Sequence, residues 1–240
     1  MAGSGPSYDS VPLEASEDLA RYNKWVVSSI ADSIRGRTLE FGAGIGTMSA
    51  LVRPLASELV LVEPADNLAN ALTTRFIDDS AVTVCRGLLA DAVTGNSEEF
   101  DAGFDTIVSF NVLEHVADDV GLLRLAHGLL RPGGRLCAFV PAGPGIYGTM
   151  DAQVDHQRRY TKATLDASLR GAGLTPIRVQ YFDLFGIVPW FFVGRVLKRT
   201  TTGAGAGWYD RLVIPPCKVV DRLTGPPRGK NLVAVAEAVS

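Results

Sequence analysis

Short, continuous apolar runs alternate with segments of helical spacing along the first 140 residues. Helical spacing also marks a segment before the first run, Leu13–Ile34, where Tyr22 and Trp25 lie on or near one face. Apolar runs without polar alternation are typical of a parallel sheet whose two faces are both covered by helices. The pattern therefore predicts a doubly wound α/β fold. The expected strands are 37–41, 59–62, 82–85, 104–109 and 135–140, and the expected helices between them are 47–55, 66–77 and 116–130, the last stopped by 131–134.

The alternation of apolar runs and helical segments ends at Pro141, where a loop rich in proline and glycine begins. Thr161 is a good N-cap for a helix that runs to about residue 169, and strands are expected at 176–182 and 231–239. Between these strands lies an unusually apolar stretch, which is followed by a flexible connector at 200–207. We expect a tail at 1–12 and one domain at 13–240 that carries an apolar cap or insertion at about 183–229.

Composition narrows the class of protein. The 240 residues are 47% hydrophobic with a net charge of −3, which gives no electrostatic footprint for nucleic acid. The three cysteines are widely separated, so neither a disulfide framework nor a zinc site is expected. The first ten residues lack the pattern of a signal peptide, and a cytoplasmic location is expected.

Three glycines, Gly42, Gly44 and Gly46, stand between the first strand and the first helix after it. Glycine is needed where the backbone turns sharply or a ligand approaches closely. Thr47 stands where a dinucleotide fingerprint would place a further glycine, and no lysine follows, which disfavours a phosphate loop. Glu63 ends the next strand, where a carboxylate can accept hydrogen bonds from both ribose hydroxyls. The ligand is therefore expected to be a nucleoside with little phosphate.

With these motifs in hand, the sequence resembles the class I S-adenosylmethionine-dependent methyltransferases. Four stretches carry the resemblance in the expected order: 39–46, 62–64, 104–116 and 130–136. The family implies a mostly parallel, seven-stranded, Rossmann-like sheet with S-adenosyl-L-methionine as cofactor. It implies that Glu40 and the glycine backbones hold the methionine end, and that Glu63 holds the ribose.

Further cofactor contacts are expected from the same resemblance. Asn111 and Leu113 lie in the turn that flanks the cofactor, and His115 is expected to cap the next helix or line the cleft. Many relatives carry an acidic residue after the third strand for the adenine amino group. This chain has Leu88 there, so either backbone groups near Leu88 or the later Asp91 are expected to serve.

The stretch from Asp151 to Tyr160 is the most chemically dense part of the chain. It follows the fifth strand, at the edge where this kind of fold binds its ligands. We predict that His156 is the general base, with Asp155 and Tyr160 as further catalytic residues. The neighbouring arginines either bind an anionic or glycosidic acceptor or pair with the aspartates to shape a lid. No metal is expected, although Asp151, Asp155 and His156 could in principle supply ligands.

The apolar stretch 182–197 has three interpretations: a cap over a hydrophobic acceptor, a dimer or core-packing surface, and a contact with a membrane surface. The basic residues Arg195, Lys198 and Arg199 keep the third interpretation open. The stretch is shorter than a membrane-spanning helix.

Together these features predict methyl transfer from S-adenosylmethionine to a small-molecule acceptor at oxygen, with a hydrophobic or sugar-bearing metabolite as the acceptor. The alternatives are methylation at nitrogen or carbon and a non-catalytic protein that binds the cofactor for regulation. A nicotinamide-dependent reductase is disfavoured by Thr47 and by the lack of a Tyr-x-x-x-Lys pair. The partners we expect are the acceptor, with a homodimer and a peripheral membrane contact as open alternatives, and no nucleic acid.

Overall fold

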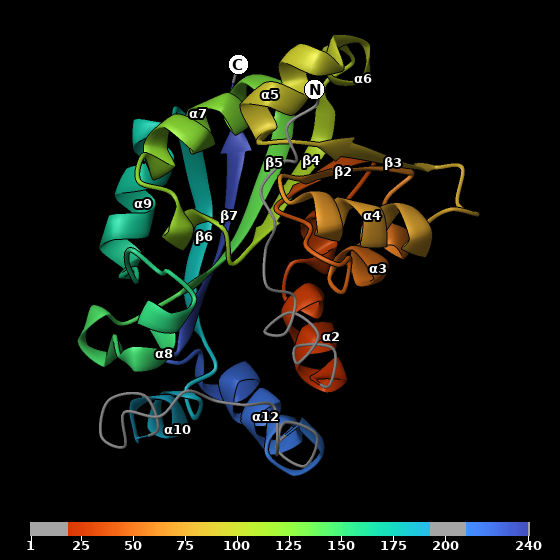
Figure 1. The fold of residues 1–240 in the computed structure, drawn as a ribbon. Helices are drawn as coiled ribbons and strands as arrows, with labels where there is room; N and C mark the ends of the chain where they lie inside the picture. Colours follow the sequence, from red (N-terminus) through yellow and green to blue (C-terminus); the bar gives the residue numbers. More distant parts are fainter. Residues whose placement is uncertain (1–18, 193–209, 240) are drawn as a thin grey trace.

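The structure is a computed structural model, and it describes residues 19–192 and 210–239. Seven strands form one sheet in the order β3-β2-β1-β4-β5-β7-β6. Only β7 runs against its two neighbours, so the predicted mostly parallel, doubly wound sheet is confirmed (Figure 1). The strands are β1 (Arg37–Phe41), β2 (Glu58–Glu63), β3 (Val82–Arg86), β4 (Phe104–Phe110), β5 (Leu130–Pro141), β6 (Leu174–Phe182) and β7 (Asn231–Ala238).

Helices cover both faces of this sheet. One face carries α5 (Leu89–Gly95), α6 (Ser97–Asp101), α7 (Asp119–Leu129) and α9 (Lys162–Gly171). The other face carries α2 (Ala20–Ser28), α3 (Ser49–Val52), α4 (Asp66–Arg75) and α12 (Ile214–Thr224). Short elements complete the described chain: α8 (Thr149–Gln153), α10 (Ile187–Phe191), and the 3-10 turns η1 (Ala31–Ser33), η2 (Arg53–Leu55), η3 (Leu113–His115) and η4 (Pro144–Ile146).

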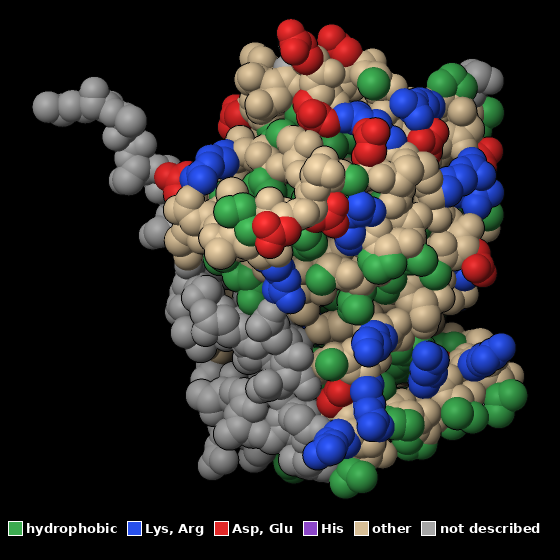
Figure 2. Space-filling view, turned by 90° about the vertical axis from the view of Figure 1, so that its right-hand side faces the viewer, with side chains coloured by type: hydrophobic (Ala, Val, Ile, Leu, Met, Phe, Trp, Pro, Cys, Tyr) green, Lys and Arg blue, Asp and Glu red, His purple; other side chains and the backbone are tan. Residues whose placement is uncertain are grey.

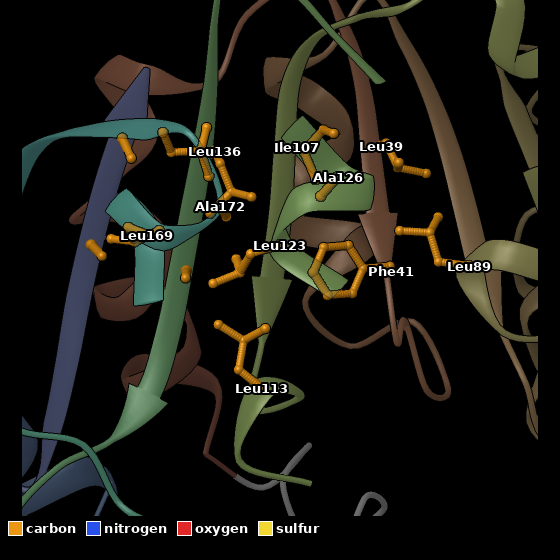
Figure 3. Close-up of a cluster of buried hydrophobic side chains, with 14 of the residues drawn as sticks. Leu39, Phe41, Leu89, Ile107, Leu113, Leu123, Ala126, Leu136, Leu169 and Ala172 are labelled. Carbon is orange, nitrogen blue, oxygen red and sulfur yellow. The ribbon is translucent and has the colours of Figure 1, made fainter. Parts of the chain in front are cut away.

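The core follows from strand alternation. In β2, Val60 and Val62 enter one hydrophobic cluster, whereas Leu59 and Leu61 enter the cluster on the opposite face. Figure 3 shows the first of these clusters, with Leu39 from β1 among its labelled side chains. Because both faces are covered, the strands contain almost no polar alternation, as the sequence pattern predicts.

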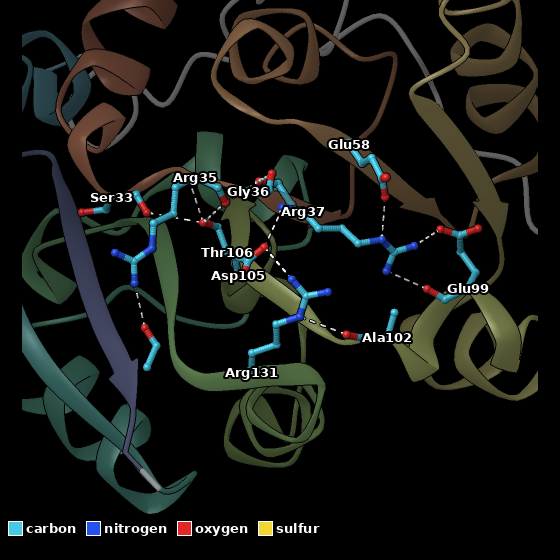
Figure 4. Close-up of polar contacts among 12 residues, drawn as sticks. Ser33, Arg35, Gly36, Arg37, Glu58, Glu99, Ala102, Asp105, Thr106 and Arg131 are labelled. Atoms are coloured by element: carbon cyan, nitrogen blue, oxygen red, sulfur yellow. Dashed lines mark hydrogen bonds and ion pairs between the residues drawn. The ribbon is translucent and has the colours of Figure 1, made fainter.

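The amino ends of the strands are tied by charged side chains (Figure 4). The Arg37 guanidinium in β1 contacts the carboxylates of Glu58 and Glu99, and its backbone N–H donates to Asp105 Oδ2 at 2.8 Å. Arg131 lies 2.8 Å from the same Asp105 oxygen. Ion pairs thus link the amino ends of the strands. Folds of this kind bind their ligands at the opposite edge of the sheet, at the carboxyl ends of the strands.

Several boundaries differ from the sequence-based prediction. The stop expected at 131–134 lies inside β5, which begins at Leu130, because a register shift against β4 lets the strand absorb the extra residues. The helix expected at 47–55 is short, since Pro54 tightens its end into a 3-10 turn. The expected tail at 1–12, the start of the first helix and the connector at 200–207 lie outside the described residues, and the insertion at 183–229 is described only in part.

Candidate active site

A cleft of about 540 Å³ opens at the carboxyl ends of β1, β2, β4 and β5. Its lining comes from α2, the loop after β1, the end of β2 with the start of α4, the turn after β4, and several segments between β5 and β7. Seven of the predicted site residues meet there: Glu40, Gly42, Gly44, Glu63, Asn111, His115 and His156.

The glycine loop adopts a backbone that other residues rarely adopt. Gly42, Gly44 and Gly46 all have positive φ angles, of 71°, 60° and 83°. A Cβ atom on Gly42 would lie 2.4 Å from Cγ2 of Val112, so the close approach of the turn after β4 requires glycine. Gly46 does not line the cleft, because it faces Leu72 of α4. The loop thus keeps two glycine backbones at the cleft and uses the third for packing.

Glu40 ends up almost completely buried at the base of the cleft, and its Oε2 atom has no hydrogen-bond partner. Burial raises the pKa of this carboxyl to about 8; the nearby Ser49 hydroxyl opposes the rise, and the charge of Glu63 adds to it. A buried carboxylate without a cation is costly, and a ligand ammonium group would remove that cost. The orphaned oxygen therefore fits the amino group of a methionine moiety.

Glu63 is held by the backbone around it. Its Oε2 accepts from the N–H of Gly44 at 2.8 Å, and its Oε1 accepts from the N–H of Ala65 at 2.9 Å. Burial raises the pKa of this carboxyl, while these two hydrogen bonds oppose the rise. A carboxylate has about four acceptor positions, so two oxygens fixed in this way can still accept from a ribose diol.

His156 lies across the cleft from the loop, after α8. Its Nδ1 atom is 2.9 Å from Oδ1 of Asp151, a carboxylate without exposed surface. Burial would raise the pKa of Asp151, but the hydrogen bond with His156 and the charge of Arg159 outweigh it and lower the pKa. An ionised Asp151 places the ring proton on Nδ1 and leaves Nε2 as the basic nitrogen of the neutral ring. Asp151, and not the neighbouring Asp155, is the residue that orients His156.

Two further ionisable residues lie beside His156. The rings of His115 and His156 pack edge to face, 4.8 Å apart, and Oε1 of Glu114 lies 3.6 Å from Nε2 of His156. Burial raises the pKa of Glu114 to about 8 and, together with the neighbouring His156, lowers that of His115. Among the described residues, Glu114, His115 and His156 form one group whose ligand atoms, all within 4.8 Å of one another, could hold a metal ion.

The far wall of the cleft is aromatic, and its residues are not among the predicted site residues. Tyr22 from α2 and Trp190 from α10 line it, together with Lys230, which precedes β7. The Lys230 ammonium lies 4.7 Å from the Tyr22 ring centroid and 3.1 Å from the buried carboxylate of Asp183. The contact between Lys230 and Tyr22 joins residues 208 positions apart in the sequence, so no local pattern predicts it.

Besides Gly46, four predicted site residues do not line the cleft. Tyr160 is buried elsewhere, with its hydroxyl 2.8 Å from Asp119 Oδ2 and 3.2 Å from the Leu113 carbonyl oxygen. Leu113 is itself fully buried in the core. Leu88 is 63% exposed at the start of α5, and Asp155 is an exposed residue with a φ of 55°. Tyr160 and Asp155 therefore lie outside the cleft lining, because the turn after α8 directs Asp151 and His156 to each other instead; their catalytic roles stay predictions.

Fold and site together define a nucleoside-binding enzyme of the doubly wound, Rossmann-like kind. Residues 39–136 match the family model of a methyltransferase domain. The chain is 28% identical over 167 residues to a ubiquinone biosynthesis O-methyltransferase of Ruegeria pomeroyi, covering 64% of this chain and 65% of that protein. It is 28% identical to the protein of that name in Xanthomonas euvesicatoria pv. vesicatoria over 189 residues, covering 72% of this chain and 76% of that protein. A phosphoethanolamine N-methyltransferase of Haemonchus contortus, solved with S-adenosyl-L-methionine, shares the fold with a TM-score of 0.65 at 16% identity, over 97% of this chain and 58% of that one.

Residues 39–136 form a methyltransferase domain, and the chain is an S-adenosylmethionine-dependent methyltransferase with the fold of these proteins. Its cofactor is S-adenosyl-L-methionine, which agrees with the glycine loop and with the buried carboxylates of Glu40 and Glu63.

Proposed function

We propose that this enzyme methylates a hydroxyl oxygen of a hydrophobic small molecule. The observation that carries the proposal is one cleft that joins the glycine loop and Glu63 to His156, whose ring is fixed by Asp151. The similarity to ubiquinone biosynthesis O-methyltransferases supports oxygen as the atom methylated. When bound, S-adenosylmethionine supplies a methyl group on a sulfonium, which is a good leaving group.

His156 is the general base in this proposal. Its Nε2 takes the proton of the acceptor hydroxyl, and the buried Asp151 carboxylate stabilises the imidazolium that forms. Glu114 is mostly protonated at neutral pH, because burial raises its pKa to about 8, so it adds little charge beside the ring. Positioning of the acceptor contributes alongside proton removal, since a fixed geometry lowers the barrier by several kcal/mol.

The acceptor end of the cleft favours a neutral, flat molecule. The Arg159 guanidinium packs 5.0 Å from the Trp190 ring centroid and already pairs with Asp151 at 2.8 Å. Lys230 likewise pairs with Asp183. Both cations are satisfied within the protein, so the described lining offers an aromatic wall and no free positive charge for an anionic acceptor. This supports a hydrophobic ring-bearing acceptor over the sugar-bearing alternative.

A panel of acceptors with release of S-adenosylhomocysteine as the readout tests the proposal. Phenols and catechols with apolar substituents, sugars and primary amines are compared at equal concentration. Turnover confined to the hydroxylated aromatic compounds supports the proposal. Turnover of the amines alone would favour nitrogen methylation, and tight cofactor binding without turnover of any compound would favour a regulatory cofactor-binding protein.

No helix in the described part of the chain is long and apolar enough to cross a membrane. A cytoplasmic location stays a prediction. A second copy of the chain and a membrane surface are alternative partners for the end of the molecule that carries α10 and α12.

A further inference from the structure

Helix α12, which the sequence did not reveal, has an unusual outward face. A surface helix normally buries one apolar face and exposes a polar one. Ile214 and Cys217 of α12 are buried in the core, yet Val219 is 56% exposed and Leu223 is 79% exposed. These last two residues are four positions apart, so they form an apolar row along the outer side of the helix.

A basic row runs beside this apolar row. Lys218 and Arg222 are exposed and also four positions apart, and Arg211 is exposed just before the helix. No ion pair is recorded for these three side chains within the described part of the chain. The outward face of α12 therefore combines unpaired positive charge with apolar side chains.

The acidic residues of the same segment all face inward. Asp210 is buried and accepts from the backbone N–H groups of Arg21 and Tyr22, at the start of α2. Asp221 is buried and accepts from the N–H groups of Asp183 and Leu184, after β6. Because these carboxylates are used within the fold, the exposed charges of residues 210–230 are all positive.

Helix α10 lies at the same end of the molecule as α12, below the carboxyl edge of the sheet (Figure 1). It presents Val188 (67% exposed) and Phe191 to the outside, while Trp190 lines the cleft. Figure 2 shows Lys, Arg and hydrophobic side chains along this lower end, whereas most acidic side chains on that face lie higher. The mouth of the cleft thus opens beside a surface that is both apolar and basic.

We propose that the outward faces of α10 and α12 dock on an anionic lipid surface. Exposed apolar rows rimmed by lysine and arginine match a headgroup layer that is apolar below and negative above. The positive charge of this surface favours an anionic lipid surface over a second copy of the chain as its partner. A second copy would place Lys218 and Arg222 in an apolar interface where no carboxylate of the same face is available to pair with them.

Vesicle binding of the full chain tests the proposal in the absence of any acceptor. We expect the protein to float with vesicles of phosphatidylcholine and phosphatidylglycerol at low salt, and to stay unbound with phosphatidylcholine alone or at high salt. The double substitution Lys218→Glu with Arg222→Glu should weaken binding on the order of 25-fold, since each basic residue contributes about fivefold. Val219→Ser with Leu223→Ser should weaken it by about tenfold.

Matched controls lie on other surfaces. Ile77→Ser removes a side chain that is 74% exposed, and Arg170→Glu reverses an exposed charge on α9. Both variants should bind vesicles as the unmodified protein does, and all variants should keep their unfolding temperature and their affinity for S-adenosylhomocysteine. Absence of vesicle binding at low salt overturns the proposal, as does equal loss in the controls. A concentration-dependent dimer that the α12 substitutions break, without lipid binding, would assign the face to a second copy. Because no acceptor is present, these outcomes do not depend on the methyl-transfer proposal.

Discussion

Nδ1 of His156 lies 2.9 Å from Oδ1 of Asp151, five residues earlier in the chain. The backbone reinforces this pairing, because the His156 N–H donates to the Asp151 carbonyl oxygen at 3.0 Å. Asp155 takes a φ of 55° in the same turn, and this conformation brings the two side chains together. The local turn thus fixes both the position and the tautomer of the ring that faces the cleft.

Replacement of His156 by alanine should lower kcat by about 10²–10⁴-fold, because a positioned base contributes that much to proton transfer. The affinity for S-adenosylhomocysteine, measured by calorimetry, should change little, since the carboxylates that hold the cofactor lie elsewhere. Near-normal turnover of the alanine variant would remove His156 from the mechanism. Turnover lost on addition of EDTA would instead point to the group formed with Glu114 and His115 as a metal site.

Tyr160→Phe is the control variant for His156→Ala, because Tyr160 lies only four residues further along the chain. Its hydroxyl contacts Asp119 and the Leu113 carbonyl oxygen in the core, so its removal should cost about 1–2 kcal/mol of unfolding free energy. Turnover should remain within about twofold of normal, because the hydroxyl does not reach the cleft. A kcat loss as large as that of His156→Ala, with normal stability, would restore a catalytic role for Tyr160.

Glu63→Gln should weaken cofactor binding on the order of 10²-fold, since two charge-assisted hydrogen bonds to the ribose lose their charge. The amide would also face the N–H groups of Gly44 and Ala65, which now donate to the carboxylate. Glu58→Gln on the same strand serves as the control, because that side chain is 59% exposed and its ion pair contributes about 1 kcal/mol or less. Equal affinities of the two variants in calorimetry would contradict the assignment of Glu63.

Gly42→Ala should impair both folding and cofactor binding. The φ of 71° is strained for alanine, and its Cβ would collide with Val112, so we expect a stability loss of about 1–3 kcal/mol. Gly128→Ala in α7 is the opposite case, with no atom within 4 Å of the new Cβ and a helical backbone that should gain up to about 1 kcal/mol. Thermal unfolding of the two variants checks the contrast, and a fully stable Gly42→Ala protein would show that the loop conformation is wrong.

Cofactor affinity should depend on pH through Glu40. Burial raises the pKa of this carboxyl to about 8, so its contribution to the stability of the unliganded protein is full below pH 4.5 and is lost as the pH rises toward 8. An ammonium ligand requires the ionised form. The affinity for S-adenosylhomocysteine should therefore rise with pH, by up to about tenfold per unit, and level off near pH 8.

Calorimetry in buffers of different ionisation enthalpy measures the proton that Glu40 releases on binding at neutral pH. The Glu40→Gln variant should release none and should show a flat pH profile with weaker binding. An unchanged profile in the variant would mean that another group couples protons to cofactor binding.

The parts of the site that sequence could predict are those in which one local motif carries the chemistry. The loop around Gly42, the strand-end carboxylate of Glu63 and the titratable ring of His156 each belong to such a motif, and all three meet in the cleft. The sequence could not show that the Tyr160 hydroxyl contacts Asp119, because a phenol in a polar stretch looks the same whether it faces a ligand or a buried aspartate.

The aromatic wall of the cleft could not be predicted from the sequence, because its residues meet only in the folded protein. Tyr22 and Trp190 reach the cleft from opposite ends of the chain, and their meeting depends on how α2 and α10 pack below the sheet. Helix α12 was missed because Pro215 and Pro216 resemble a loop, although proline is well tolerated in the first turn of a helix. Its apolar residues on both the inner and the outer side also hide the usual helical period.

The most direct test of the methyltransferase assignment is the release of S-adenosylhomocysteine by purified protein given S-adenosylmethionine and a panel of hydrophobic phenols and catechols. We expect acceptor-dependent release by the unmodified protein, a loss of about 10²-fold or more in His156→Ala, and normal cofactor binding in both. Equal release by the unmodified protein and the His156→Ala variant, or no release with any acceptor despite tight cofactor binding, would contradict this expectation.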